Sequence, residues 1–293
     1  MVVTKTPCRL FVIHARRAHV AVILLRGPAK WTQVIRWDTA SDTFTDGQWF
    51  HGTFYDRRCD LSPSGERMVY FVAQHHRQNV DPTYTNAWTA ISKPPYLTAV
   101  ALWPNGGTTY HGGGLFEDES TLLLNSIESR WANVQEGRMP SAHPKHAPPA
   151  RLKVVPISHA AGDQLFPRRL VRDGWTQVTA ADLRGETMIE RGELVRARDG
   201  FQIDLSFDHQ RANYVLHEAA SRNSRHELRR LDTLEGAQWA DWDLRGRLLV
   251  AKEGRLFAVQ TKPRGELPEL VELADFNGRR PARVLSPAAA RKW

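Results

Sequence analysis

The sequence is poor in cysteine and has no long hydrophobic run. Only Cys8 and Cys59 occur among its 293 residues, so it can form neither a disulfide framework nor a four-cysteine zinc site. No apolar stretch approaches the roughly 20 residues that a membrane-spanning helix needs. The most hydrophobic early segment, Val20–Leu25, leads into the turn pair Gly27-Pro28 and not into the small residues of a cleavage site. We therefore expect a cytoplasmic protein with two reduced thiols and no membrane segment.

The motifs of common catalytic and cofactor sites are also missing. No Walker loop, Gly-x-Gly-x-x-Gly turn or Gly-x-Ser-x-Gly elbow occurs. The run His111–Gly114 is similar to the oxyanion loop of hydrolases, but without that elbow we interpret it as a bend where backbones approach closely. His75 and His76 would point to opposite sides of a strand, and His143 and His146 have no carboxylate or cysteine nearby. We accordingly predict no catalytic residue, no metal site and no cofactor.

What the chain does have is an excess of positive charge. It carries 40 basic and 32 acidic residues, for a net charge of +8 and an isoelectric point near 9.8. The densest basic clusters are Arg222–Arg230, Arg279-Arg280 and Arg168-Arg169, and none of them is a long run. Scattered charge of this kind favours a solubilising surface. Attraction to nucleic acid remains a second interpretation.

Short β-rich runs follow one another along most of the chain, and a turn-plus-strand phrase recurs. Asp60–Gly65 precedes one β-rich run, Asp182–Gly185 precedes another, and Asp243–Gly246 a third. Repeated units of about 40–50 residues, each a four-stranded sheet, predict radial stacking in a β-propeller. We therefore expect an all-β fold with a single propeller-like domain over residues 1–293. About six units fit the chain, with five as the alternative, and we place the six at 8–52, 53–104, 105–157, 158–198, 199–238 and 239–285.

The first of these phrases carries a resemblance to a known superfamily. Asp60-Leu-Ser-Pro-Ser-Gly65, followed by Met68-Val-Tyr-Phe71, resembles the Ser-Pro-Asp-Gly phrase of TolB-like and WD40-like propellers. The phrases at Asp182 and Asp243 lack the Ser-Pro pair, and Trp37-Asp38 is an isolated match to the Trp-Asp of WD repeats. The resemblance implies the fold and carries no catalytic residue with it.

Two segments stand outside this repetition. Residues 139–150 contain four prolines between Met139 and Pro149, so they cannot hold a strand ladder and are predicted to form an exposed, extended loop. The C-terminal run Ala288–Trp293 has no evident packing partner in the sequence, and we expect it to fray.

One passage is unusually rich in aromatic residues. Tyr84, Trp88, Tyr96, Trp103 and Tyr110 fall close together, around the run Lys93-Pro-Pro95. Such residues either fill the wedge between neighbouring sheets or form a binding face, because Trp, Tyr and Arg dominate interface hot spots. The residues we select for partner binding are Trp88, Tyr96, Trp103, Tyr110 and His111.

The leading functional hypothesis is a protein-interaction or scaffold module without catalytic activity, whose partner is another protein. The second is a basic propeller that binds nucleic acid through its scattered Lys and Arg residues. The third is a hydrolase or lyase that uses the central channel, a hypothesis that rests on fold analogy alone.

Overall fold

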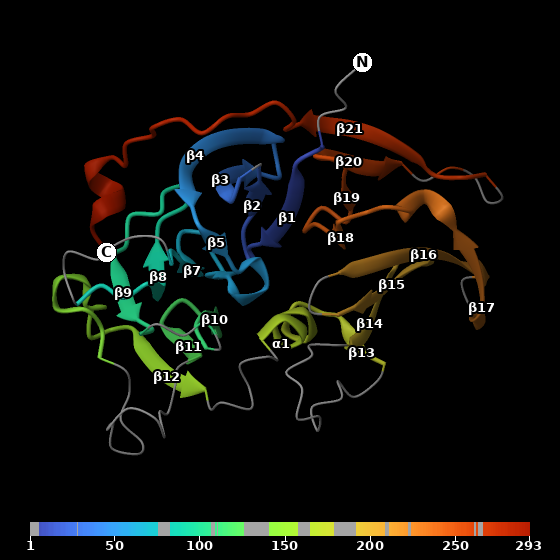
Figure 1. Cartoon of the computed structure of the whole chain (residues 1–293). Helices are drawn as coiled ribbons and strands as arrows, with labels where there is room; N and C mark the ends of the chain where they lie inside the picture. Colours follow the sequence, from blue (N-terminus) through green and yellow to red (C-terminus); the bar gives the residue numbers. More distant parts are fainter. Residues whose placement is uncertain are drawn as a thin grey trace. The chain divides into compact units, whose positions relative to one another are not determined.

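The protein consists of short strands joined by turns (Figure 1). The computed structural model describes residues 6–27, 29–75, 83–106, 109, 111–125, 141–157, 165–178, 192–208, 211–221, 224–260, 262 and 266–293. Helical structure in this part of the chain comprises α1 (Leu165–Arg172) and short 3-10 turns. The prediction of an all-β fold is confirmed.

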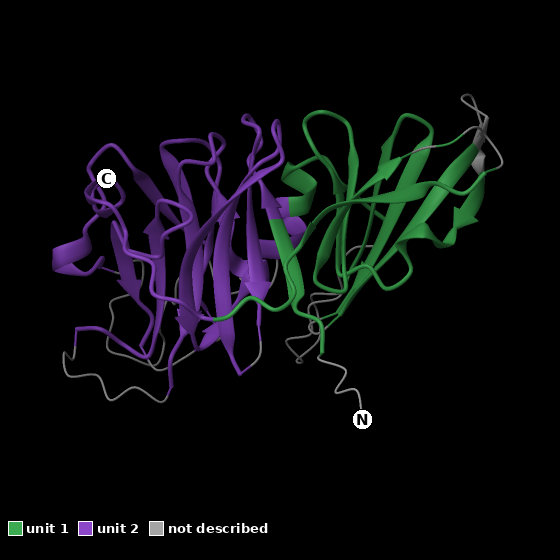
Figure 2. Cartoon of the chain, turned by 90° about the horizontal axis from the view of Figure 1, so that it is seen from above, with its two compact units in different colours: residues 1–12, 170–280 green, residues 13–169, 281–293 purple. Residues whose placement is uncertain are grey.

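The chain divides into two compact units, which Figure 2 colours separately. Unit 1 comprises residues 1–12 and 170–280, and unit 2 comprises residues 13–169 and 281–293. The chain therefore passes from one unit to the other three times. Each unit is described by itself below.

Unit 2 contains three sheets whose strands are mostly neighbours in the chain. Sheet A has the order β1-β2-β3-β4, with the first residues of β1 counted in unit 1; sheet B has the order β5-β7-β8-β9, with β6 beside β7. Sheet C has the order β10-β11-β12, and its β11–β12 pair is parallel. The strands are β1 (Arg9–His14), β2 (Val20–Arg26), β3 (Trp31–Asp38), β4 (Thr43–His51), β5 (Thr53–Phe54), β6 (Asp60–Leu61), β7 (Met68–Ala73), β8 (Ala87–Ser92), β9 (Ala101–Pro104), β10 (Gly114–Phe116), β11 (Thr121–Asn125) and β12 (Lys153–Ile157).

Unit 1 contains two further sheets, each an antiparallel meander. Sheet D has the order β13-β14-β15-β16-β17, and sheet E the order β18-β19-β20-β21. The strands are β13 (Thr176–Gln177), β14 (Gly192–Arg198), β15 (Phe201–Phe207), β16 (Ala212–Ser221), β17 (Ser224–Leu231), β18 (Trp239–Trp242), β19 (Leu248–Lys252), β20 (Arg255–Gln260) and β21 (Glu269–Asp275).

The described residues thus form five sheets, three in unit 2 and two in unit 1, which is the lower of the two expected counts. The units placed at 8–52, 53–104, 105–157 and 239–285 coincide with sheets A, B, C and E. The boundary placed at residue 199 is wrong, because Asp199 and Gly200 form the hairpin between β14 and β15. Both residues have positive φ angles, 50° and 84°, as the tight turn of a two-residue hairpin requires. Sheet D therefore continues across this expected boundary.

Continuous hydrophobic runs form the central strands of unit 2. Every residue of β7 is buried, as is β2 from Val20 to Leu25. A strand covered on both faces needs apolar residues at consecutive positions, so it loses the alternation of a half-exposed strand. The interpretation of Val20–Leu25 as a strand is confirmed.

The C-terminal segment does not fray, contrary to expectation. Trp293 packs against the hydrophobic cluster shared by sheets B and C, and the Arg67 guanidinium lies 4.9 Å from the centre of a Trp293 ring. Ala290 is only 4% exposed, and the Ser286 hydroxyl bonds that of Thr98 at 2.9 Å. The packing partners lie about 200 positions earlier in the chain, where no local pattern could reveal them.

The Pro-rich segment is a loop with one buried anchor. Its described part, residues 141–150, contains a 3-10 turn at Pro144–His146 and is mostly exposed or half-buried. His143 is the exception at 3% exposed, and its backbone N–H donates to Leu102 O of β9 at 2.8 Å. In the described residues, no helix is long and apolar enough to cross a bilayer.

Candidate functional site

The predicted aromatic residues fall on both faces of sheet B. In the register of this sheet, Trp88 of β8 lies opposite Val72 and Pro104, whereas Trp103 of β9 lies opposite Thr89. Successive residues of a strand point to opposite faces. Trp88 and Trp103 therefore point away from each other, and the structure does not join them in one patch.

Trp103 lies in the hydrophobic core. It is 3% exposed and belongs to a cluster that sheet B shares with sheet C and that includes Val69, Ile91, Phe116 and Leu122. This is the wedge-filling role that the sequence left open beside partner binding. As placed, Trp103 offers little surface for a partner.

His111 and the glycines after it form a crowded bend. His111 is 6% exposed, and its carbonyl accepts a hydrogen bond from the Asn105 amide. The N–H of Gly112 donates to Asn125 O, and the N–H of Gly113 donates to the Thr89 hydroxyl. Both amides are therefore occupied within the fold, which agrees with the structural interpretation of this run. Tyr110 lies outside the described residues.

Tyr96 and Trp88 lie near opposite ends of β8. Trp88 is the second residue of the strand, and Tyr96 follows its other end in the turn after Lys93. Both side chains are half-buried. The C-terminal segment docks on the Tyr96 end, where the Lys93 ammonium donates to Ala289 O at 3.0 Å.

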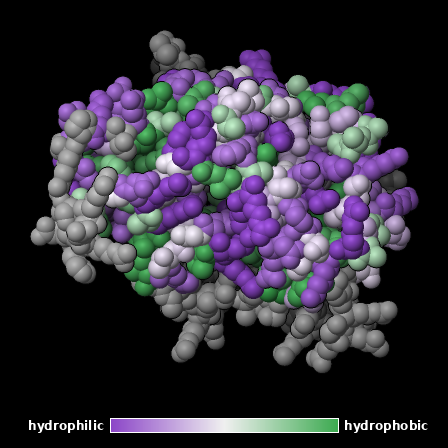
Figure 3. All heavy atoms as spheres, turned by 180° about the vertical axis from the view of Figure 1, so that it is seen from behind, coloured by the Kyte–Doolittle hydropathy of each residue, from purple (hydrophilic) through white to green (hydrophobic). Residues whose placement is uncertain are grey.

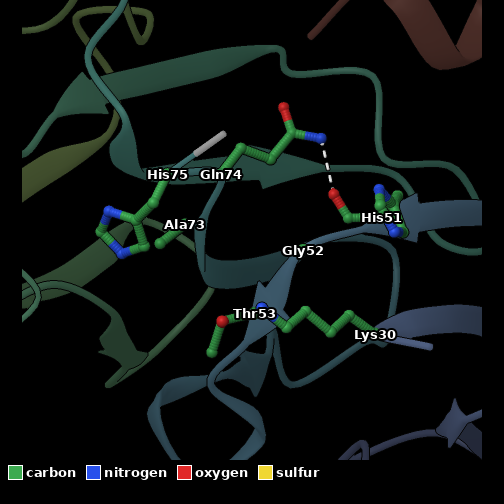
Figure 4. A pocket seen from close by; sticks show the side chains of 7 residues that line it. All are labelled: Lys30, His51, Gly52, Thr53, Ala73, Gln74 and His75. Carbon is green, nitrogen blue, oxygen red and sulfur yellow. Dashed lines mark hydrogen bonds between the residues drawn. The ribbon is translucent and has the colours of Figure 1, made fainter. Parts of the chain in front are cut away.

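The Trp88 end of the sheet carries a pocket that the sequence did not reveal. Its cavity measures about 270 Å³, and Figure 4 shows His51 and His75 on opposite sides of it, with the Lys30 side chain extending toward Thr53. We call it the Lys30 pocket. Its lining comes from three separate places in the chain: Lys30, His51, Gly52, Thr53, Ala73, Gln74 and His75.

Short connections between sheets A and B hold this pocket in shape. The N–H of Gly52 donates to Lys30 O at 3.0 Å, and the Gln74 amide donates to His51 O at 2.7 Å. These two bonds tie the turn before β3 and the end of β7 to the link between β4 and β5. Within the described part of the chain, the lining includes an ammonium and two imidazoles but no carboxylate, so its polar groups suit an anion.

Half-buried aromatic rings lie next to residues that line the Lys30 pocket. The Trp31 ring lies 4.7 Å from the His51 ring. Phe50, next to His51 in the chain, meets Trp88 edge-on with ring centres 5.9 Å apart. We call Trp31, Phe50 and Trp88 the aromatic rim. Of the residues selected from the sequence, Trp88 is linked to this pocket through Phe50, whose ring lies next to Gly52.

A second polar cluster joins the Pro-rich loop to the chain before β8. The Tyr84 ring stacks on His143 at 4.1 Å, and the Tyr84 hydroxyl lies 3.1 Å from His146 Nε2. The Thr83 hydroxyl lies 2.7 Å from His143 Nε2, and the N–H of Lys145 donates to His143 Nδ1. Burial, followed by nearby His143 and Lys145, lowers the pKa of His146 below its ordinary value of 6.5.

This depressed pKa predicts an acid-sensitive stability. In the unfolded chain His146 takes up a proton near pH 6.5, whereas in the folded protein it stays neutral to a lower pH. The contribution of neutral His146 to the free energy of unfolding is therefore complete above pH 6.5. It is lost as pH falls through the lower folded-state pKa. Melting at about pH 7.5 and about pH 5.5 should show a smaller pH dependence in His146→Gln than in wild type. The matched variant of exposed His19, His19→Gln, should behave as wild type; equal pH dependence in all three proteins would contradict the prediction.

Both cysteines are free thiols in hydrophobic or crowded surroundings. Burial, with a smaller contribution from Asp275, raises the pKa of the Cys8 thiol to about 11. Complete burial also raises the pKa of Cys59. Neither environment activates a thiolate at neutral pH.

Many arginines of unit 1 are engaged in ion pairs. Arg196 bonds Asp241, and Arg247 bonds Asp243 at 2.8 Å. The other pairs are Arg198–Asp199, Arg229–Glu218, Arg230–Asp232 and Arg255 with Glu272 and Asp275. On the face drawn in Figure 3, hydrophilic residues are interspersed with small hydrophobic groups. Pairing with acids lowers the electrostatic attraction that these arginines offer to a phosphate backbone.

Comparison with known proteins finds little. No family model matches the chain, and no match is found among curated proteins. A solved structure that is similar is the β-propeller domain of the Trilobed protease from Pyrococcus furiosus, with 8% sequence identity and a TM-score of 0.30. The similarity covers 93% of this chain and 100% of that one. A TM-score this low assigns no function.

Proposed function

We propose that this protein is a non-enzymatic interaction module, and that a partner protein docks on the aromatic rim beside the Lys30 pocket. The observation that carries the proposal is the juxtaposition of half-buried aromatic rings with an open, cationic pocket at one end of sheets A and B. Interface hot spots combine large aromatic side chains with charged groups in this way.

The geometry of the rim supports this role. Phe50 packs edge-on against Trp88 and also meets Phe54, which is 1% exposed. The rim therefore rests on a buried ring and keeps its conformation in the absence of a partner. A surface that is already ordered loses less conformational entropy when a partner binds.

The other residues selected from the sequence enter the proposal in different ways. Tyr96 is half-buried at the far end of β8 and is a candidate for a second, separate contact. Trp103 and His111 are buried and would act by supporting sheet B from within the core. For Tyr110, partner binding remains a prediction.

Replacing Trp88 by alanine should lower retention of a protein partner at least about tenfold, because a central aromatic anchor carries much of an interface's binding energy. The tagged full-length chain would be used to capture proteins from a lysate of its own cells, with a wash at low salt and then at high salt. Retained proteins would be identified by mass, and nucleic acid by absorbance.

Phe44→Ala is the matched control for this experiment. Phe44 is also half-buried and stacked on another ring, Trp37, but it lies at the opposite end of β4. Loss of the partner in Trp88→Ala but not in Phe44→Ala would support the site. Equal retention by both variants would refute the site assignment, and nucleic acid that elutes with salt would favour the second hypothesis.

A further inference from the structure

We propose that the Lys30 pocket binds a carboxylate carried by an acidic segment of the partner protein. This inference rests on the proposed function, because it names the chemistry that the same surface would recognise. Three features of the pocket carry it: its unneutralised charge, its hydrogen-bond donors and its limited size.

Glycine at residue 52 lets the link between β4 and β5 pass close to the end of β7 at the pocket. A Cβ atom at Gly52 would lie 2.5 Å from Ala73 O, 2.7 Å from the Phe50 ring and 3.0 Å from Gln74 Cγ. The φ angle of 153° also disfavours a side chain at this position. Only glycine fits this close approach of the two segments. The cavity that they line measures about 270 Å³, which admits a side chain rather than a large ligand.

The Lys30 charge at the pocket has no acidic partner among the residues that the structure describes. Among the described residues, no carboxylate lies within the ion-pair distance of 4.0 Å from the Lys30 ammonium. Lys30 is exposed and stands in a turn with a φ angle of 64°, which directs the chain from β2 into β3. Many arginines of unit 1 are paired with acidic residues, whereas the positive charge of Lys30 is available to a ligand.

The hydrogen-bond donors of the pocket match a carboxylate better than a phosphate. The Lys30 ammonium and the Thr53 hydroxyl can each donate to a carboxylate oxygen, and His51 and His75 add imidazole groups on either side. Phosphate sites draw on arginine forks or on several backbone amides at a helix N-terminus. No arginine occurs among the described lining residues, and the backbone amide of Gly52 already donates to Lys30 O.

The position beside the aromatic rim favours a protein segment as the source of the carboxylate. A peptide with a Glu or Asp residue next to an apolar one could place its carboxylate in the pocket and its apolar side chain on Trp88 or Phe50. Continuous nucleic-acid binding would instead require a basic groove that follows the backbone, and the lining supplies a single bounded site.

The test uses the full chain and a labelled hexaglutamate peptide, with fluorescence anisotropy as the readout. Hexaglutamine is the uncharged control peptide, and a short oligothymidylate of matched charge is the phosphate probe. We expect hexaglutamate to bind and hexaglutamine not to bind. Lys30→Gln should weaken hexaglutamate binding about fivefold, the factor that one partly exposed ion pair supplies.

Two further variants make the result specific to the pocket. Thr53→Val keeps the shape of the side chain and removes the hydroxyl donor, and should weaken binding about twofold. Lys153→Gln removes the same charge as Lys30→Gln from an exposed position on β12, outside the pocket, and should leave binding within error of wild type.

Each contrary result overturns the inference. Wild type that does not bind hexaglutamate, or equal weakening by Lys30→Gln and Lys153→Gln, would show that the pocket is no carboxylate site. Tighter, Lys30-dependent binding of oligothymidylate would assign the pocket to phosphate instead. If Trp88→Ala loses the captured partner while Lys30→Gln leaves hexaglutamate binding unchanged, the interaction role stands and only the carboxylate inference fails.

Discussion

Trp103→Ala is expected to lower the free energy of unfolding by about 3–5 kcal/mol, the usual cost of removing a large aromatic side chain from a core. Trp103 is 3% exposed and packs among residues of sheets B and C. Its removal leaves a cavity that the rigid strands around it cannot close. The same residue was selected from the sequence as a partner contact, so the experiment separates packing from binding.

Chemical denaturation of the full chain, followed by tryptophan fluorescence and far-UV circular dichroism, measures this effect. Trp88→Ala is the comparison variant. Because the Trp88 ring is only half-buried, its removal should lower the free energy of unfolding by only about 1–2 kcal/mol. A Trp103→Ala protein with unchanged stability but without its partner would reverse the assignment of the two tryptophans.

Gly112→Ala is expected to destabilise the protein by more than about 3 kcal/mol, the second large effect. The φ angle of Gly112 is 115°, where an L-residue pays about 1–3 kcal/mol in backbone strain. In addition, a Cβ at this position would overlap the Phe71 ring, and Phe71 is completely buried in β7 and cannot move aside without repacking. Strain and overlap act together at this position.

Gly106→Ala separates these two costs. Gly106 also has a positive φ, 65°, but nothing lies within 4 Å of a Cβ built there, so only the conformational cost of about 1 kcal/mol applies. Thermal melting of both variants gives the comparison. Equal melting temperatures would show that the bend at Gly112 is not crowded and would reopen the interpretation of the His111–Gly114 run.

Strand-level features of this fold could be predicted from local patterns. The runs at Val20–Leu25 and Met68–Val72 are strands because consecutive apolar residues suit a strand that is covered on both faces. The predicted division into units matched sheets A, B, C and E. It failed at Asp199-Gly200, because a tight hairpin and a link between sheets use the same turn residues.

The candidate site was predictable only in part. Aromatic density identified the region around Trp88, since large rings either fill a core or serve a surface. Which of the two applies depends on the strand register, and the register of β8 with β9 decides it for Trp88 and Trp103. From the sequence, His75 could be considered only as a metal ligand. Its pocket neighbours Lys30 and Thr53 lie more than 20 positions away in the chain, so no local pattern indicated the pocket.

The sequence by itself determined the all-β class, most of the strand positions and the bend at His111–Gly114, because these follow from interactions between residues close in the chain. Only the tertiary structure decided that the C-terminal Trp293 packs beside Arg67 and that Lys30, Gly52 and Gln74 enclose one pocket. Such contacts join segments that are distant in sequence, and their geometry depends on how whole sheets pair and pack. A local pattern therefore indicates which strands form, while register and packing decide which side chains meet.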